Sequence, residues 1–179
     1  MKIIVTGGAG FIGSHIVDAY LKAGHRVAII DNLSSGSRKN LNPKARFHKA
    51  DIKNLAALRA IFKKERPQIV NHHAALVSVV ESTRDPLLTY RTNFLGTTNL
   101  LLAFGEVRTK SKKFIYASTG GALYGDPAKI PADEKTAIEP LSPYGLSKYL
   151  AERAITFHAK ENGFTYLLLR YSNVYGPRQ

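Results

Sequence analysis

The 179-residue chain contains no cysteine, which excludes both a disulfide framework and a thiolate metal site. The absence of disulfides fits the reducing cytoplasm, and we expect a cytoplasmic protein. No apolar run approaches the roughly twenty residues that a membrane-spanning helix needs, and the first residues form a strand-and-glycine pattern instead of a signal peptide. We therefore expect no membrane partner.

Acidic residues are scarce, because 13 Asp and Glu stand against 26 Lys and Arg and give a formal net charge of +13. Many of the basic residues lie in segment 38–66, where the only acids are Asp51 and Glu65. Such clustering can indicate a nucleic-acid surface. Here the basic residues alternate with apolar ones at helical spacing, and their face carries no aromatic residue for base stacking. We therefore interpret them as a solvated helix face and predict no nucleic-acid partner.

The rest of the chain is organised around residues 2–14. An apolar run at 3–5 is typical of a strand buried on both faces, and it breaks at Gly7 into a glycine-rich turn followed by helix-periodic residues. The spacing of Gly7, Gly10 and Gly13 suits a turn that holds a pyrophosphate at a helix N-terminus, although a tight turn without a ligand would show the same spacing. A second apolar run ends at Asp31, where a dinucleotide site places the carboxylate that binds the adenosine ribose.

Apolar runs and helix-periodic segments alternate along the remaining sequence. We expect further strands at 46–50, 68–72, 113–117 and 165–170, helices at about 54–65, 86–104 and 144–161, and a loop rich in glycine and proline at 118–143. Helices between strands imply right-handed crossovers and a parallel sheet. We therefore predict one α/β domain, a doubly wound, Rossmann-like parallel sheet of order 3-2-1-4-5-6 with helices on both faces and a site at the carboxyl ends of the strands.

Tyr144 and Lys148 are four residues apart, so on a helix their side chains share one face. A positive charge about 4 Å from a phenol, at an effective dielectric constant of about 20, stabilises the phenolate by roughly 4 kcal/mol, or about three pKa units. A surface pair would have the same spacing. Because the pair follows a dinucleotide loop, and because Ser118 and Thr119 end the preceding strand on the same edge of the sheet, we predict that Tyr144 is a general base whose pKa Lys148 lowers.

The adjacent histidines His72 and His73 raise the question of a metal. Neighbouring residues on a strand point to opposite faces, and no carboxylate or thiol stands at ligand spacing. We predict no metal site.

An ordered series of motifs extends over the whole chain. The motifs are TGGAGFIGS (6–14), DNLSSG (31–36), HAA (73–75), NFLGT (93–97), ASTGGALYG (117–125), PYGLSK (143–148) and LRYSNVYGPRQ (169–179). With them the chain resembles the extended short-chain dehydrogenase/reductase family, the NAD-dependent nucleotide-sugar epimerases and dehydratases, and among these the UDP-glucose 4-epimerases. The resemblance implies NAD as cofactor and a nucleotide sugar, with a UDP-hexose as the best guess, as substrate.

The resemblance also implies a role for each site residue. The implied pyrophosphate residues are Gly7, Gly10, Phe11, Ile12 and Gly13, with Asp31 and Asn32 at the adenosine ribose and Asp51 and Ile52 at the adenine. The other implied contacts are His73, Ala74 and Ala75 along the cofactor, Lys148 at the nicotinamide ribose, and Tyr171 and Val174 on either side of the nicotinamide. Asn93 is implied near the cofactor as an anchor, or else as a satisfied polar residue inside a helix. Tyr144 is the implied base, Thr119 the hydroxyl that binds the reacting sugar oxygen, with Ser118 as the alternative, and Asn173 the contact to the substrate phosphate.

The implied reaction is epimerisation through a transient 4-keto sugar, in which Tyr144 takes the hydroxyl proton while hydride moves to the nicotinamide. Dehydratases of the family carry an Asp-Glu pair directly after the active-site Thr, and this chain has Gly120 and Gly121 there. Two alternatives to an epimerase remain: a nucleotide-sugar dehydratase or reductase of the same family, and an NAD-binding domain without turnover. We expect NAD in preference to its 2′-phosphorylated form because Asp31 would repel the phosphate, although Arg38 and Lys39 lie close in the sequence.

Relatives continue past the position of Gln179 into a substrate-binding domain, which we expect to be absent from residues 1–179. Without that domain we expect the chain to fold and bind NAD, but to turn over UDP-galactose at least ~10⁴-fold more slowly than a full-length enzyme. The reason is that nothing would hold the sugar carbon close to the nicotinamide and in the right orientation.

Relatives also dimerise through two long helices, here about 86–104 and 144–161. The second helix is more apolar than one core-facing stripe requires, so we expect a homodimer. The residues behind this expectation are Leu150, Ala154, Ile155, Phe157 and His158.

Overall fold

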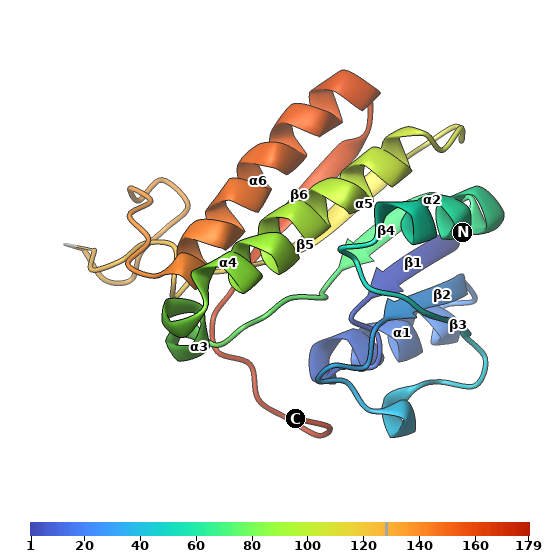
Figure 1. Cartoon of the computed structure of the whole chain (residues 1–179), viewed down its shortest axis with the longest axis horizontal. Helices are drawn as coiled ribbons and strands as arrows, with labels where there is room; N and C mark the ends of the chain where they lie inside the picture. The colour runs from blue at the N-terminus through green and yellow to red at the C-terminus, as the bar shows by residue number, and fades with distance from the viewer. Residues whose placement is uncertain (128) are drawn as a thin grey trace.

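The computed structural model describes residues 1–127 and 129–179 and contains one parallel six-stranded sheet (Figure 1). The strands are β1 (Lys2–Thr6), β2 (Arg26–Asp31), β3 (Arg46–Lys49), β4 (Ile69–His72), β5 (Lys113–Thr119) and β6 (Thr165–Tyr171). Their order across the sheet is β3-β2-β1-β4-β5-β6, and every neighbouring pair is parallel. The predicted fold class and strand order are confirmed.

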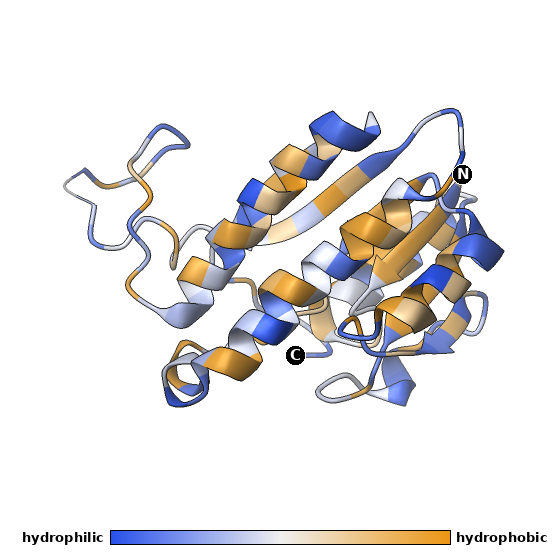
Figure 2. Ribbon diagram, turned by 45° about the horizontal axis from the view of Figure 1, so that its top comes forward, coloured by the Kyte–Doolittle hydropathy of each residue, from blue (hydrophilic) through white to orange (hydrophobic). Residues whose placement is uncertain are grey.

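Helices cover both faces of the sheet, but unequally (Figure 1). Helix α1 (Phe11–Lys22) packs on one face, where Val17 contacts the buried side chains that β1 and β2 present to that face. Helices α2 (Leu55–Glu65), α5 (Gly96–Gly105) and α6 (Pro143–Asn162) pack on the other face and enclose the larger core. Figure 2 shows hydrophobic residues concentrated in the central strands and along the helix faces that cover them.

The basic segment has the structure that its periodicity predicts. Leu58 and Phe62 of α2 are buried in the core, whereas Arg59, Lys63 and Lys64 are exposed on the opposite face of the helix. The Asn54 side chain begins the helix by accepting a hydrogen bond from the Ala57 backbone N–H at 3.0 Å. Within the described residues, no helix is long and apolar enough to cross a membrane.

The long helix expected at 86–104 is not a continuous α-helix. Asp85 caps it as predicted, since its side chain accepts a hydrogen bond from the Leu88 N–H at 2.9 Å. After α4 (Pro86–Thr89) the chain forms a π-helical segment, η2 (Tyr90–Leu95), before α5 begins. The wider turn buries Thr92 and Asn93, which face the loop after β4. Such π-helical segments are rare and occur frequently at functional sites.

A short helix that the sequence did not lead us to expect, α3 (Val79–Arg84), precedes this segment. Its signal was present, because Ser78 is followed three residues later by Glu81, and the Ser78 hydroxyl accepts a hydrogen bond from the Glu81 N–H at 3.1 Å. Helix α3 supports the start of α6: the Tyr144 backbone N–H donates to the Ser82 hydroxyl at 3.1 Å. The expected loop at 118–143 begins and ends as predicted to within two residues, and residue 128 lies outside the described residues.

Candidate active site

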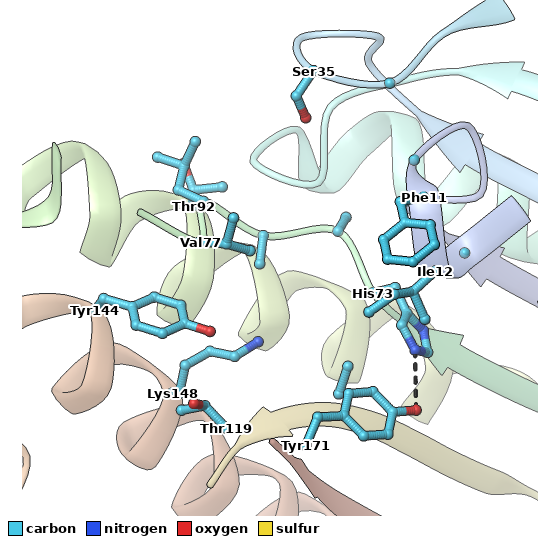
Figure 3. A pocket seen from close by; sticks show the side chains of 18 of the residues that line it. Phe11, Ile12, Ser35, His73, Val77, Thr92, Thr119, Tyr144, Lys148 and Tyr171 are labelled. Atoms are coloured by element: carbon cyan, nitrogen blue, oxygen red, sulfur yellow. Dashed lines mark hydrogen bonds between the residues drawn. The ribbon is translucent and has the colours of Figure 1, made fainter. Parts of the chain in front are cut away.

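A cavity of about 740 Å³ lies at the carboxyl ends of the strands, a volume typical of small-molecule sites. The predicted site residues that line it are Gly7, Gly10, Phe11, Ile12, Gly13, Asp31, Asn32, Asp51, Ile52, His73, Ala74, Ala75, Ser118, Thr119, Tyr144, Lys148, Tyr171, Asn173 and Val174. They come from the loops after all six strands and from the first turns of α6 (Figure 3). Of the residues predicted for the site, only Asn93 is not among those that line the cavity.

The turn between β1 and α1 leaves no room for a side chain at two of its glycines, Gly7 and Gly13. Gly7 has a φ of +69°, and a Cβ there would lie 2.7 Å from the Ala74 nitrogen. A Cβ at Gly13 would collide with the Gly7 carbonyl oxygen. Gly10 precedes α1 without a side-chain cap, so the helix offers its first N–H groups and its positive dipole end to the cavity.

Three polar side chains follow β2 and β3 at the opposite end of the cavity. Asp31, at the end of β2, is held by the Ala9 N–H at 3.0 Å and the Leu33 N–H at 2.8 Å, one to each carboxylate oxygen. The Asn32 amide donates to Asp51 at 3.1 Å and so ties the two strand ends together. Each Asp31 oxygen keeps a free lone pair for a hydroxyl donor.

A buried relay runs through His72 beneath the loop after β4. The Thr6 hydroxyl oxygen accepts from the His73 and Ala74 backbone N–H groups, both at 3.2 Å, so its own proton faces His72 Nδ1 at 2.6 Å. The Thr97 hydroxyl donates to the Asn93 carbonyl, so it accepts from His72 Nε2 at 2.8 Å. His72 is therefore neutral, and burial lowers its pKa well below the usual 6.5.

Asn93 acts behind the cavity wall. Its amide accepts from the Leu76 N–H at 2.8 Å, donates to the Leu76 carbonyl at 2.9 Å, and donates to the Ser147 hydroxyl at 3.0 Å. These three bonds join the loop after β4, the π-helical segment and α6. Asn93 is buried, its amide is fully engaged in these bonds and it does not line the cavity, which fits both an anchor of the wall and a satisfied polar residue inside a helix; its place near the cofactor stays a prediction.

Tyr144 and Lys148 line the same end of the cavity (Figure 3), yet the predicted effect of Lys148 on Tyr144 is wrong for the protein without a ligand. Burial raises the pKa of Tyr144, and the Thr119 hydroxyl offsets only part of that rise. Lys148 is itself 4% exposed, and burial lowers its pKa from 10.5 to about 7. Its ammonium lies 4.5 Å from the centroid of the Tyr116 ring. The expectation counted only the attraction between the two charges at an effective dielectric constant of about 20, whereas desolvation has the larger effect here.

Several buried polar atoms in the cavity have no hydrogen-bond partner among the described residues. These are Ser118 Oγ, Thr92 Oγ1 and His73 Nδ1, and all three residues line the cavity. Each unpaired buried polar atom costs about 1–3 kcal/mol of stability. His73 also contacts Tyr171, whose hydroxyl lies 3.4 Å from His73 Nε2 (Figure 3).

Some cavity residues were not assigned from the sequence. Ser34, Ser35 and Gly36 line the cavity beside Asp31, and their motif DNLSSG could have indicated them. Thr92 carried no sequence signal, because only the π-helical turn brings it to the cavity. Within residues 1–127 and 129–179 no group of three or more potential ligands could hold a metal ion.

Comparison with known proteins shows close relatives. The UDP-glucose 4-epimerase of Thermotoga maritima, solved with UDP-glucose, is 47% identical with a TM-score of 0.96, and the match covers 100% of this chain and 58% of that one. The Thermus thermophilus UDP-glucose 4-epimerase, solved with NAD, is 42% identical with a TM-score of 0.94, covering 100% and 57%. The UDP-glucose 4-epimerase of Lactobacillus helveticus is 39% identical over 176 residues, 98% of this chain and 52% of the relative.

The chain thus spans about half the length of the curated relatives that it matches. Residues 3–179 match the model of the NAD dependent epimerase/dehydratase family. The matched range includes the glycine turn, the Tyr144–Lys148 pair and every other residue that lines the cavity. The chain therefore belongs to the NAD dependent epimerase/dehydratase family.

Proposed function

We propose that the protein binds NAD and uses it in the epimerisation of a UDP-hexose through a 4-keto intermediate. The observation that carries this proposal is that one cavity brings together the uncapped N-terminus of α1 and the group formed by Tyr144, Lys148 and Thr119. The relatives solved with NAD and with UDP-glucose support the choice of cofactor and substrate.

The cavity fits a dinucleotide along its length. The glycine turn admits a pyrophosphate against the backbone, where a side chain at Gly13 could not be accommodated. Asp31 presents two acceptor oxygens for ribose hydroxyls, and neither Arg38 nor Lys39 lines the cavity to receive a 2′-phosphate. When bound, NAD would supply the hydride acceptor and donor of the reaction.

The chain's own groups handle the proton. Burial keeps Tyr144 protonated in the protein without a ligand, so a general-base role requires its pKa to fall when the cavity is filled. A positively charged nicotinamide in the cavity would favour the phenolate form of Tyr144 and so lower its pKa. The Thr119 hydroxyl, which lines the cavity together with Tyr144, would bind the reacting sugar oxygen, with Ser118 next to it.

Two measurements test the proposal. Calorimetric titration of the 179-residue chain should show NAD binding, and the absence of binding would overturn the proposal. A chimera that continues after Gln179 with the unmatched part of the Thermotoga maritima enzyme should interconvert UDP-glucose and UDP-galactose, and Tyr144→Phe in it should remove turnover while NAD still binds. The 179-residue chain alone should be at least ~10⁴-fold slower than the chimera.

The alternatives give different outcomes. A 4-keto-6-deoxy product would indicate a dehydratase. A folded chimera that binds NAD and UDP-glucose without turnover would indicate a binding domain.

The homodimer and the cytoplasmic location stay predictions. Leu88, Leu95 and Leu102 are 43%, 50% and 37% exposed at a spacing of seven residues, and they lie on the α4–α5 segment that packs beside α6 (Figure 1). Phe157 of α6 is 63% exposed, whereas Ile155, expected on this face, is buried in the core. We propose that this surface pairs two copies of the chain.

Light scattering at tens of micromolar should give the mass of a dimer. Leu95→Glu should reduce it to that of a monomer. Leu141→Glu, at a leucine 79% exposed in the loop before α6, is the matched control and should leave it unchanged. A monomeric unmodified protein would contradict the proposed dimer.

A further inference from the structure

An ion pair with a buried carboxylate and a partly buried arginine lies one helical turn after Lys148. Glu152 of α6 is 3% exposed, and Arg170 of β6 binds it through two parallel contacts, Nε to Oε1 at 3.1 Å and Nη2 to Oε2 at 2.8 Å. A buried carboxylate is costly unless a cation and hydrogen bonds compensate it, and this bidentate geometry does so.

The same arginine joins two further parts of the site. Its Nη1 donates to the Tyr124 hydroxyl at 2.8 Å, which ties down the loop after β5. The next residue of β6 is Tyr171, which lines the cavity beside His73. The pair of Glu152 and Arg170 therefore connects α6, which carries Tyr144 and Lys148, to β6, which carries Tyr171, and to the loop after β5.

Glu152 also has an electrostatic relation to Lys148. The ionisable groups around the Lys148 ammonium are His72 at the end of β4, His73 in the loop after it, Tyr116 on β5, and Tyr144 and Glu152 on α6. Glu152 lies four residues after Lys148 on the same face of α6, and its negative charge raises the pKa of Lys148 against the larger effect of burial. It does so through space, because both its oxygens bond to Arg170 and the two side chains form no ion pair within 4.0 Å.

We propose that Glu152 is a positioning residue: through Arg170 it fixes α6 against β6, and so it sets the place and the surroundings of the buried Lys148 side chain one turn earlier on the same helix. A charged Lys148 can donate hydrogen bonds to a ligand, whereas a neutral one in this apolar setting donates poorly. The consequence for cofactor binding rests on the proposed function, but the effect on Lys148 does not.

The charge of Lys148 can be measured directly in the protein without ligand. NMR of protein labelled with ¹³C at the lysine Cε follows each lysine through a pH titration, and the Lys148 signal is identified by its absence from Lys148→Met. In the unmodified protein this signal should titrate near pH 7, since burial lowers its pKa to about 7 while Glu152 opposes the shift. In Glu152→Gln the midpoint should fall by at least about one pH unit.

Arg170→Gln supplies the opposite test. It leaves the Glu152 carboxylate with Lys148 as the nearest buried cation, so the Lys148 midpoint should rise. Tyr124→Phe is the matched control, because it removes one hydrogen bond to Arg170 and keeps the ion pair, and the midpoint should stay within about 0.3 units. A purely structural role would give shifts of the same sign, or none, in Glu152→Gln and Arg170→Gln, and that result would overturn the proposal.

A second readout concerns the cofactor. If Lys148 must be charged to bind NAD, the pH above which NAD affinity falls should move down in Glu152→Gln by the same amount as the NMR midpoint. A shift in the NMR midpoint without any NAD binding would leave the inference on Glu152 intact and contradict the proposed function instead. An unchanged NMR midpoint with normal NAD binding would contradict the inference on Glu152 and leave the proposed function intact.

Discussion

Lys148 should make the folded protein less stable than a variant with an uncharged side chain at the same position. Its pKa falls from 10.5 to about 7 on folding, so the unfolded chain binds the proton more tightly. At 1.36 kcal/mol per unit, linkage gives a destabilisation of about 4 kcal/mol at pH 7 and about 2 kcal/mol at pH 9, vanishing above pH 10.5. Below pH 7 the destabilisation is present in full.

Lys148→Met replaces the buried ammonium with an unbranched apolar side chain over the Tyr116 ring. Allowing up to about 1.5 kcal/mol for imperfect packing, the variant should be more stable by about 2–4 kcal/mol at pH 7. The gap should shrink by about 2 kcal/mol at pH 9, because the charge contributes less there. Urea unfolding followed by circular dichroism at both pH values measures the difference.

Lys44→Met is the matched control. Lys44 is exposed and forms no ion pair within the described residues, so its replacement should change the free energy of unfolding by less than about 0.5 kcal/mol at either pH. The reasoning is refuted if Lys148→Met is less stable than the unmodified protein at pH 7. It is also refuted if the gap between the two proteins does not depend on pH.

Three further outcomes follow from the site. Gly13→Ala should weaken NAD binding by at least about 100-fold in a calorimetric titration, because its Cβ collides with the carbonyl of Gly7 and deforms the turn. Asp31→Asn should reduce the preference for NAD over its 2′-phosphorylated form by at least about tenfold, measured as the ratio of dissociation constants, because it removes a negative charge. Burial lowers the pKa of His73 from 6.5 to about 4, so the free energy of unfolding should fall by on the order of 3 kcal/mol as the pH drops from 6.5 to 4. In His73→Phe, urea unfolding should show a smaller loss of this free energy over the same pH range.

Much of the fold could be predicted because its signals are local. The apolar runs of β1 and β2 and the break at Gly7 follow from neighbouring residues, and right-handed crossovers then restrict the sheet order. The cavity followed in turn, since the carboxyl ends of parallel strands meet at one edge. Asp31 and Thr119 each end a strand as expected and line that cavity.

The features that were missed depend on distant contacts. The π-helical segment holds Asn93 against the backbone of Leu76, seventeen residues earlier, and no periodicity encodes that bond. The direction of the Tyr144 pKa depends on how much water the folded site excludes, which the spacing to Lys148 does not reveal. The relay through His72 requires Thr6 and Thr97 on either side of the ring, and these residues come from different elements.

Buried polar and charged groups that destabilise the folded protein lie together at one edge of an otherwise well-packed sheet. In the middle of the sheet His72 is buried with both ring nitrogens hydrogen-bonded, whereas the site holds a desolvated Lys148 and an unpaired Ser118 hydroxyl. Each of these groups costs stability that an apolar replacement would recover. Because a ligand with suitable donors and acceptors can satisfy them, the free energy lost in folding the empty site becomes selective affinity for the molecule that fills it.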